Sequence, residues 1–319
     1  MSTKIEWSEE VWNPIVGCSR VSAGCENCYA ERVAHRAMQP AHVGLTVMGK
    51  KGPRWNGTVR TLPERLSTPL RWRKPRRVFV NSMSDLFHEA VPFEFIAAVF
   101  GVMAACPRHT FQLLTKRPAR AAEFFAWASS LPTQTGKGWR DGAPVVGYLG
   151  EHALRLTGGR CNVWRKGPLA PWPLPNVHIG VSVEDQATAD ERIPILLTLP
   201  AALRWISYEP AIGPVDFWGA RYRSPKGGLH GAVSSWGGVN WIVVGGESGP
   251  GARPFDLAWA RSTVAQCKAA GVPCFVKQVS KRPWHTNSAG QRVQLCMEHN
   301  KGGDPSEWPA NIQIREMPA

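Results

Sequence analysis

Short runs of apolar, β-branched residues recur along the chain of 319 residues, and they constrain its fold more than any other feature. The runs are continuously apolar rather than alternating, which is typical of strands buried on both faces of a parallel sheet. Longer amphipathic segments separate them. The predicted strands are Val11–Val16, Arg77–Asn81, Thr110–Leu114, Val177–Val183, Leu203–Ser207, Trp241–Gly245 and Pro273–Lys277.

Helices are predicted between these strands. Their ranges are Cys28–Met38, Phe93–Cys106, Asp185–Leu199 and Leu257–Ala270. Pro92 lies just before the second helix, and Asp256 and Gly271 are placed to cap and to end the last one. The alternation of strand and helix predicts an α/β fold, a partial or complete parallel βα-barrel, with a doubly wound open sheet as the alternative.

Two long segments interrupt this alternation. Residues 127–176, rich in Gly, Pro and Trp, separate the third and fourth strands, and residues 219–238 separate the fifth and sixth. Long loops in compact domains are often functional lids, so we expect either insertion to cover the top of the barrel. No low-complexity linker divides the chain, and we expect a single domain over residues 1–319.

Cys18, Cys25 and Cys28 form the one tight cluster among the eight cysteines. They follow the first predicted strand, with six and then two residues between them. Thiolates are soft ligands that suit iron–sulfur clusters and zinc. The number three is informative, because a four-iron cluster on three cysteines leaves one iron free to bind a cofactor. S-Adenosylmethionine can chelate that iron, and its reductive cleavage gives a 5′-deoxyadenosyl radical.

Zinc is the alternative metal for these cysteines. His35 or His42 would complete a site with three cysteines and one histidine. Structural zinc sites usually pair two short ligand hairpins, whereas this chain has a single CxxC pair. A ligand set at the carboxyl end of a strand also suits an active site better than a structural site. The iron–sulfur interpretation is therefore favoured.

The net charge of the chain is +14, from 38 Lys and Arg against 24 Asp and Glu. Such an excess favours polyanionic partners, because neutralising phosphates releases counterions. Trp lies beside basic residues in Arg71–Lys74 and Trp164–Lys166, which suits base stacking next to phosphate contacts. Nucleic acid is the predicted partner, and the predicted phosphate contacts are Arg71, Arg73, Lys74, Arg76, Arg77, Arg117, Arg165 and Lys166.

The cysteine segment GCSRVSAGCENCYAER resembles the cluster loop of the radical S-adenosylmethionine superfamily. The whole chain resembles the phage Gp37/Gp68-type (DUF5131-like) family of uncharacterised radical-enzyme-like proteins. The segments that carry the resemblance are Trp12–Glu31, Asn81–Asp85, Leu114–Pro118, Gly180–Glu184, Ser207–Pro210, Gly245–Gly249 and the final KGGDPSEWP. The sequence departs from the superfamily in its longer first cysteine gap and in Asn27, which stands where an aromatic residue usually precedes the third cysteine.

The resemblance implies that polar residues at the strand ends bind S-adenosylmethionine. The implied cofactor-binding residues are Tyr29, Asn81, Ser82, Ser84, Asp85, Lys116, Glu184, Glu209, Gly245, Gly246 and Glu247. A flavodoxin or ferredoxin is the implied reductant. Two further residues, Cys161 as a hydrogen-atom donor and Tyr208, are candidate catalytic residues.

These features predict a radical S-adenosylmethionine enzyme with a [4Fe–4S] cluster that modifies or repairs a DNA or RNA base. Two alternatives stay open: a zinc-stabilised nucleic-acid-binding protein without catalysis, and a radical enzyme acting on a small molecule or peptide. The chain has no apolar run of about 18 residues and no signal peptide, so we expect a cytoplasmic protein without membrane contact. We also expect a monomer.

Overall fold

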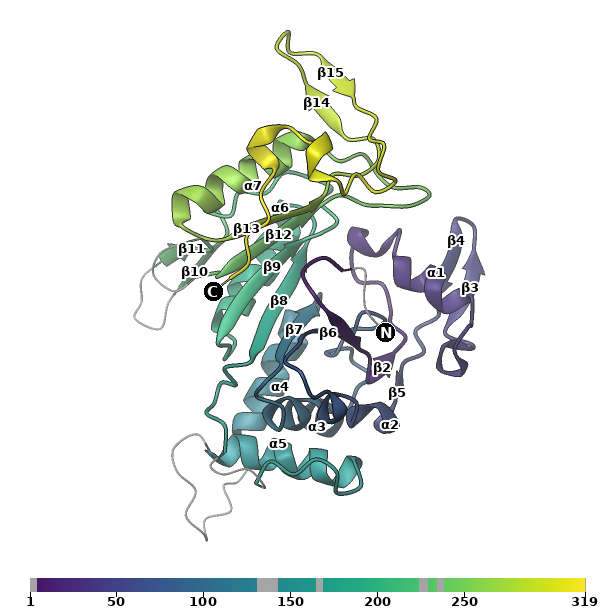
Figure 1. Cartoon of the computed structure of the whole chain (residues 1–319), viewed down its shortest axis with the longest axis vertical. Coiled ribbons are helices and arrows are strands. Elements are labelled where there is room, and N and C mark those ends of the chain that lie inside the picture. Colours follow the sequence, from purple (N-terminus) through teal and green to yellow (C-terminus); the bar gives the residue numbers. More distant parts are fainter. Residues whose placement is uncertain (1–4, 131–142, 165–168, 224–228, 234–237, 319) are drawn as a thin grey trace. The chain divides into compact units, whose positions relative to one another are not determined.

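The computed structural model describes residues 5–130, 143–164, 169–223, 229–233 and 238–318. Within these residues seven strands form one sheet in the order β1-β6-β7-β8-β9-β12-β13 (Figure 1). The pairs β1–β6, β6–β7, β9–β12 and β12–β13 are parallel, which confirms the predicted α/β class with a parallel sheet. The strands are β1 (Glu10–Trp12), β6 (Arg77–Val80), β7 (Thr110–Thr115), β8 (Val177–Val183), β9 (Leu203–Tyr208), β12 (Trp241–Gly245) and β13 (Cys274–Gln278).

The first predicted strand proves to be two strands. β1 ends at Trp12, and β2 (Ile15–Val16) leaves the sheet to pair antiparallel with β5 (Arg60–Thr61). Pro14 lies between them, and proline has no N–H group to donate to a sheet. Cys18 therefore follows this short two-stranded pairing, and not the seven-stranded sheet as the sequence predicted.

All four predicted helices are present; the last has the predicted ends, and the ends of the other three differ by up to three residues. They are α1 (Tyr29–His35), α3 (Phe93–Ala104), α6 (Gln186–Thr198) and α7 (Leu257–Ala270). The predicted cap of α7 is confirmed, because the Asp256 carboxylate accepts a hydrogen bond from the Ala258 amide at 2.9 Å. Gly271 ends α7 with a positive φ of 67°, as a left-handed helix end requires.

Contacts divide the chain into two compact units. Unit 1 consists of Met1–Arg20, Cys28–Ile179 and Leu199–Leu203. Unit 2 consists of Val21–Asn27, Gly180–Thr198 and Arg204–Ala319. Strand β8 passes from the first unit into the second. The boundaries also run through the cysteine segment, so Cys18 and Cys28 belong to unit 1 and Cys25 belongs to unit 2.

The first insertion is more helical than its composition indicated. It includes the end of α4 (Pro118–Ser130) and α5 (Ala143–Leu156), and α5 packs against α3 within unit 1. Gly101 of α3 allows this approach, since a Cβ there would lie 2.2 Å from the Leu149 carbonyl oxygen. The described part of residues 127–176 thus supports α3, where the sequence predicted a loop over the barrel top. The sequence signal for α5 that was missed is the helical spacing of Val146, Leu149 and Ala153, which are buried.

Several small elements were not predicted from the sequence. In unit 1 these are the hairpin of β3 (Thr46–Gly49) and β4 (Gly52–Trp55) and the short helix α2 (Pro63–Leu66). In unit 2 they are the antiparallel pairs β10 (Arg221–Arg223) with β11 (Leu229–Gly231) and β14 (Trp284–Thr286) with β15 (Arg292–Gln294). Single 3₁₀ turns cover Ala23–Cys25, Pro40–His42, Pro69–Arg71, Pro305–Glu307 and Ala310–Ile312. None of the helices within the described ranges has the length and apolar character needed to span a bilayer.

Candidate functional site

In unit 1 the chain turns sharply into Cys18. Gly17 has a φ of 90°, and a Cβ at this position would lie 2.1 Å from the Thr58 carbonyl oxygen. Only glycine fits such a conformation and such a close approach. The Gly17 backbone also forms a bridge to Ser84, which follows β6. The turn therefore places Cys18 at the edge where β6 and β7, a parallel pair, both end.

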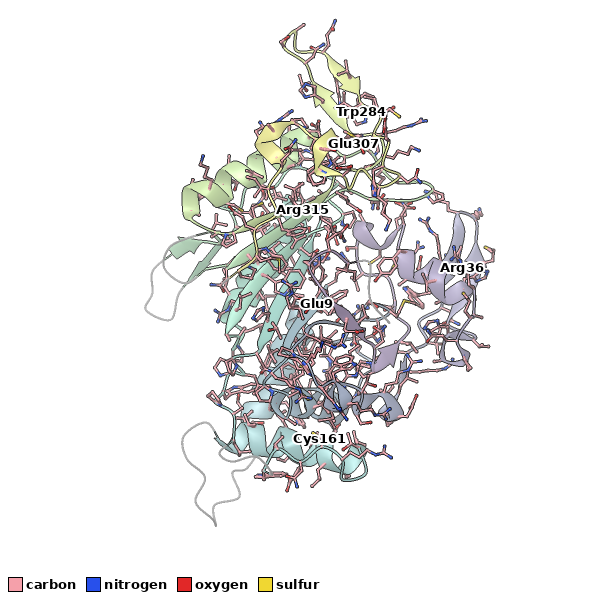
Figure 2. All side chains as sticks on the ribbon, in the orientation of Figure 1. Glu9, Arg36, Cys161, Trp284, Glu307 and Arg315 are labelled. Atoms are coloured by element: carbon pink, nitrogen blue, oxygen red, sulfur yellow. The ribbon has the colours of Figure 1, made fainter. Side chains whose placement is uncertain are left out.

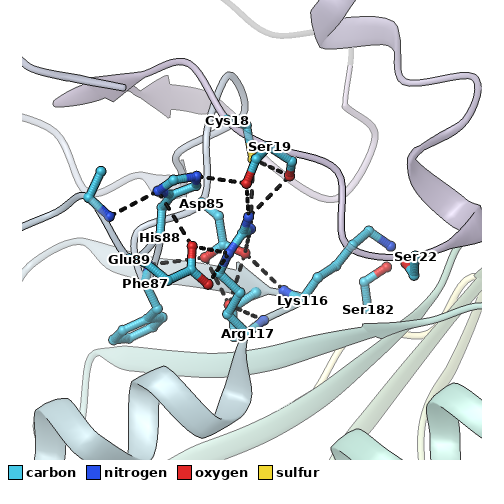
Figure 3. A network of polar contacts seen from close by, with 12 residues as sticks. Cys18, Ser19, Ser22, Asp85, Phe87, His88, Glu89, Lys116, Arg117 and Ser182 are labelled. Atoms are coloured by element: carbon cyan, nitrogen blue, oxygen red, sulfur yellow. Dashed lines mark hydrogen bonds and ion pairs between the residues drawn. The ribbon is translucent and has the colours of Figure 1, made fainter. Parts of the chain in front are cut away.

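The Arg117 side chain connects Cys18 to this edge (Figure 3). Its Nη1 lies 3.7 Å from Cys18 Sγ, and its Nη2 donates to the Ser19 hydroxyl at 2.8 Å and to the Ser19 carbonyl at 3.1 Å. On its other side the guanidinium contacts Asp85 at 3.3 Å and Glu89 at 3.1 Å. Arg117 is only 6% exposed. The sequence placed Arg117 among the phosphate contacts, whereas the structure shows it holding the Cys18 turn.

Asp85 is the buried anchor of this arrangement, which we call the Arg117 network. Its carboxylate accepts hydrogen bonds from the Thr115 hydroxyl at 2.8 Å and from the amides of Lys116 and Phe87 at 3.0 Å each. Burial by itself would lower the pKa of Arg117, but Asp85, the Cys18 sulfur and Glu89 outweigh it and raise that pKa. The guanidinium therefore stays charged next to Cys18.

His88 is a member of the Arg117 network that sequence reasoning missed. Its Nε2 lies 2.9 Å from the Ser19 hydroxyl. Burial first and the Arg117 charge second lower the pKa of His88, so the ring is neutral at pH 7. Its position three residues after Asp85, in the segment that follows a predicted strand, is the one signal that pointed to it.

Cys18 and Cys28 are half-buried and pack against the same apolar cluster of unit 1. That cluster contains Val16, Ala30, Ala34, Leu45, Trp55, Leu62 and Met83. Cys28 directly precedes α1, and the hydroxyl of the next residue, Tyr29, donates to the Ser82 carbonyl at 2.7 Å. Tyr29 thereby ties the start of α1 to the segment after β6.

Asn81, the first residue after β6, has a buried amide with no hydrogen-bond partner among the described residues. The residue is 4% exposed and has a positive φ of 64°. The serine hydroxyls that follow it already have hydrogen-bond partners. The Ser82 hydroxyl pairs with Asn13 at 3.1 Å, and the Ser84 hydroxyl donates to the Ile15 carbonyl at 2.9 Å. Buried polar groups are nearly always satisfied, so the Asn81 amide is a candidate to bind a ligand.

In unit 2 the segment Val21–Asn27, which carries Cys25, is held by carboxylates that follow two strands. The Ser22 hydroxyl donates to Glu184 at 2.9 Å, and the Asn27 amide donates to Glu247 at 2.9 Å. Gly24 must be glycine because a Cβ there would lie 2.5 Å from the Glu184 side chain. Glu184 and Glu247, predicted as cofactor ligands, thus position the Cys25 segment.

Each of these two carboxylates is also paired with an arginine. Glu184 is fully buried and accepts a hydrogen bond from Arg192, itself 2% exposed, at 3.1 Å. Glu247 is held by the side chain and amide of Arg253, whose Nη2 also donates to the Ala23 carbonyl at 2.9 Å. Burial would raise the pKa of Glu247, but hydrogen bonds from Arg253 and Asn27 lower it below its ordinary value. Glu247 is therefore ionised at neutral pH.

The other predicted site residues of unit 2 lie at the ends of β9 and β12. A Cβ on Gly245 would lie 2.6 Å from Glu209 Oε1, and one on Gly246 would lie 2.8 Å from Phe255. Side chains of the protein therefore take up the space beside both glycines, which the resemblance gave as cofactor-binding residues. Glu209 forms an ion pair with Lys277 at 3.1 Å. Tyr208 is fully buried and donates to the Gly213 carbonyl, and its pKa is raised by burial and then by Asp185.

Cys161 is not brought to the strand ends. It is fully buried behind α3, where its thiol donates to the Gly101 carbonyl at 3.7 Å (Figure 2). Because α3 runs back from the end of β6 to the start of β7, Gly101 in its last turn lies toward the amino ends of these strands. Burial, and then Cys106, raises the pKa of Cys161 to about 12. This thiol has the character of a core residue.

The basic segment Arg71–Arg77 ends at the first residue of β6 and so lies toward the amino ends of the unit 1 strands. Arg76 is paired with Glu10, and Arg77 lies 3.9 Å from Glu9. Trp72 stacks edge-on against His109, whereas Arg71, Arg73 and Lys74 are exposed. The structure thus separates this segment from the Arg117 network. Arg165 and Lys166 lie outside the described residues.

The side chains around the cysteines can be compared with the ligands that the predicted metal would need. No group of three or more His, Cys, Asp or Glu side chains is assembled as metal ligands in the described ranges. For the alternative zinc site, the structure shows His35 bound to the Thr46 hydroxyl at 3.1 Å and His42 buried. The half-buried thiols of Cys18, Cys25 and Cys28 are soft donors that suit either an iron–sulfur cluster or zinc.

A family model described as "Protein of unknown function (DUF5131)" matches residues 2–303. No curated protein matches the chain. No solved structure matches it either.

Proposed function

Because the match over residues 2–303 shows that the chain belongs to the DUF5131 family, whose description names no function, we propose from its own residues that it is a radical S-adenosylmethionine enzyme. The cysteines Cys18, Cys25 and Cys28 would hold a [4Fe–4S] cluster. The observation that carries the proposal is the trio of cysteines at its six-and-two spacing, with the buried Arg117 guanidinium 3.7 Å from the first sulfur. The order of the parallel strands supports a partial βα-barrel as the scaffold.

When bound, the cluster and S-adenosylmethionine would supply a 5′-deoxyadenosyl radical that abstracts a hydrogen atom from the substrate. The protein's own residues have simpler tasks. Arg117 keeps a positive charge beside Cys18 and fixes the turn through Ser19. Asp85 orients Arg117, and the ordered Asn81 amide offers one donor and one acceptor to the polar end of the cofactor. Glu184 and Glu247 fix the segment that carries Cys25.

We propose a nucleic acid as the substrate class, with modification or repair of a base as the reaction. The support for it is the net charge of +14 and the exposed Arg71, Arg73 and Lys74. A base within a duplex would have to leave the stack to reach the site. The basic segment lies away from the Arg117 network, so its task would be to hold the polynucleotide backbone at a distance from the reacting base.

The proposed activity is tested by anaerobic reconstitution with iron and sulfide, followed by dithionite and S-adenosylmethionine. We expect release of 5′-deoxyadenosine by the parent protein and loss of that release in Cys25→Ala. Cys296→Ala is the matched control, because Cys296 is an exposed cysteine outside the trio. An oligonucleotide that is a substrate raises the yield, and salt abolishes the increase. A reconstituted protein that leaves S-adenosylmethionine intact contradicts the proposal.

A further inference from the structure

The hairpin of β14 and β15 projects from the body of unit 2 (Figure 1). A two-stranded hairpin alone is only marginally stable in water, so neighbouring residues have to support its shape. At its base the Trp284 amide donates to the Phe255 carbonyl at 2.7 Å, and the Met297 amide donates to the Lys281 carbonyl at 2.9 Å. Strand β14 also packs against α7. The base of the hairpin is thus fixed to unit 2.

The tip of the hairpin, residues 287–291, is ordered by one side chain. Asn287 Oδ1 accepts hydrogen bonds from the Ala289 amide at 3.1 Å and from the Gln291 amide at 2.9 Å. Gly290 has a φ of 76°, which glycine adopts without strain. Because the turn is already ordered, a partner that contacts the tip loses little affinity to conformational entropy.

The two faces of the hairpin have different surroundings. His285 faces α7, where two terminal nitrogens of Arg261 lie 3.3 Å from its Nδ1. The opposite face carries Thr286, Arg292 and Gln294, and all three are exposed. This outward face presents a hydroxyl, a guanidinium and an amide, which are groups that form hydrogen bonds with base edges.

Arg292 is oriented by an aromatic ring. Its guanidinium lies over Trp284, at the base of the hairpin, 4.8 Å from the ring centre (Figure 2). Such a cation–π contact holds the plane of the guanidinium. Arg292 also lies 3.7 Å from Asp256, but its side chain is 56% exposed. The guanidinium is therefore positioned and still accessible to a partner.

The charge of the hairpin has one sign. Residues 281–297 contain Lys281, Arg282 and Arg292 and no acidic residue, and all three basic side chains are exposed. None of the large apolar side chains that are exposed in the described residues belongs to this segment. Protein interfaces depend on apolar and aromatic anchors at their centre, which the hairpin does not offer. Its surface therefore favours a polyanion over a protein.

Among nucleic acids, duplex DNA fits the shape of the hairpin best. The major groove of B-form DNA is about 12 Å wide and admits a two-stranded β-ribbon. The major groove of an RNA duplex is too narrow for side chains to reach the bases. A single strand favours exposed aromatic rings for stacking, but Trp284 is half-buried and has Arg292 over its ring.

We propose that the β14–β15 hairpin docks in the major groove of double-stranded DNA. Thr286 and Arg292 contact the edges of the bases, and Lys281 and Arg282 contact phosphates where the hairpin leaves the groove. This inference rests on the proposed function for its choice of a nucleic acid as substrate, and it narrows that class to duplex DNA.

The test measures binding of the full chain to a short DNA duplex, with no S-adenosylmethionine or reductant present. The variant is Lys281→Gln with Arg282→Gln. We expect it to bind the duplex about 10-fold or more weakly, and the slope of log affinity against log salt to become shallower by about 2, one for each lost phosphate contact. The matched control is Lys50→Gln with Lys51→Gln, which removes the same charge from the exposed turn of the β3–β4 hairpin and leaves binding unchanged.

A second variant tests insertion of the tip into the groove. Ser288 is exposed at the tip, so Ser288→Glu keeps the free energy of unfolding of the parent and places a carboxylate between the phosphates. We expect this variant also to bind the duplex about 10-fold more weakly, because like charges repel. Methyl green, which occupies the major groove, should compete with the protein, whereas the minor-groove ligand netropsin should not.

Other outcomes overturn the docking proposal. They are duplex binding by the two hairpin variants that equals the parent's, an equal loss in the Lys50 and Lys51 control, competition by netropsin alone, and binding of an RNA duplex or a single strand as tight as that of the DNA duplex. A chain that binds duplex DNA through the hairpin but releases no 5′-deoxyadenosine refutes the radical chemistry and supports docking. A chain that releases 5′-deoxyadenosine and binds DNA independently of the hairpin refutes docking alone.

Discussion

Replacing Asp85 by alanine is expected to lower the free energy of unfolding by about 3–5 kcal/mol. Asp85 and Arg117 are both buried, and the substitution leaves the guanidinium without its closest buried counter-charge. The Thr115 hydroxyl and the amides of Lys116 and Phe87 lose their acceptor as well. Because the same network fixes the Cys18 turn, we also expect faster loss of bound iron. Urea titration at pH 7 measures the first effect.

Glu89→Ala is the matched control for Asp85, since Glu89 pairs with the same arginine at 3.1 Å but its side chain is 65% exposed. Exposed ion pairs contribute about 0–1 kcal/mol, so this variant should unfold close to the parent. Equal destabilisation by the two substitutions would show that burial does not set the strength of the Asp85 contact.

Replacing Glu184 by alanine is expected to cost a similar amount, about 3–5 kcal/mol, in unit 2. The substitution leaves the buried Arg192 without its buried carboxylate and releases Ser22 at the start of the Cys25 segment. We expect Glu184→Gln, which keeps an acceptor for Ser22, to retain more of the bound iron than Glu184→Ala. Urea titration measures the loss of stability, and iron content followed over time measures the loss of iron.

Glu191→Ala supplies the control in unit 2. Glu191 lies 4.0 Å from the same Arg192, but its side chain is 68% exposed. We expect a change within about 1 kcal/mol and unchanged retention of iron. Loss of stability in Glu191→Ala that matched the loss in Glu184→Ala would contradict the assignment of Glu184 as the buried partner.

The strands and helices could be predicted because their patterns are local. The apolar runs gave β8 and β12 with their exact ends, and Asp256 and Gly271 marked the ends of α7. The break between β1 and β2 was missed although Pro14 signalled it. The β3–β4 hairpin was missed because its residues, half-buried or exposed except Trp55, lack the apolar alternation that identifies a strand.

The site could be predicted only as a set of residue positions. Strand ends placed Asp85, Lys116 and Arg117 at one edge, and the structure brings them together. Their partners could not be predicted, because hydrogen bonds between residues about 30 positions apart depend on the tertiary fold. The sequence therefore predicted that Arg117 contacts a phosphate. In the structure its side chain is buried, pairs with Asp85 and lies beside Cys18.

The neighbours of the glycines at the strand ends could not be predicted. Gly245 and Gly246 were predicted to bind a cofactor, and the structure shows that Glu209 and Phe255 lie beside them. A sequence shows that a side chain must be absent at such a position. It does not show which atom needs the room, because that atom belongs to a residue distant in the chain.

The metal content of the protein purified without oxygen tests the central claim most directly. A [4Fe–4S] cluster on Cys18, Cys25 and Cys28 predicts about four irons and four sulfides per chain, a brown colour, and loss of all three in Cys18→Ala, Cys25→Ala and Cys28→Ala. One tightly bound zinc per chain, with no iron and no colour, would contradict the account.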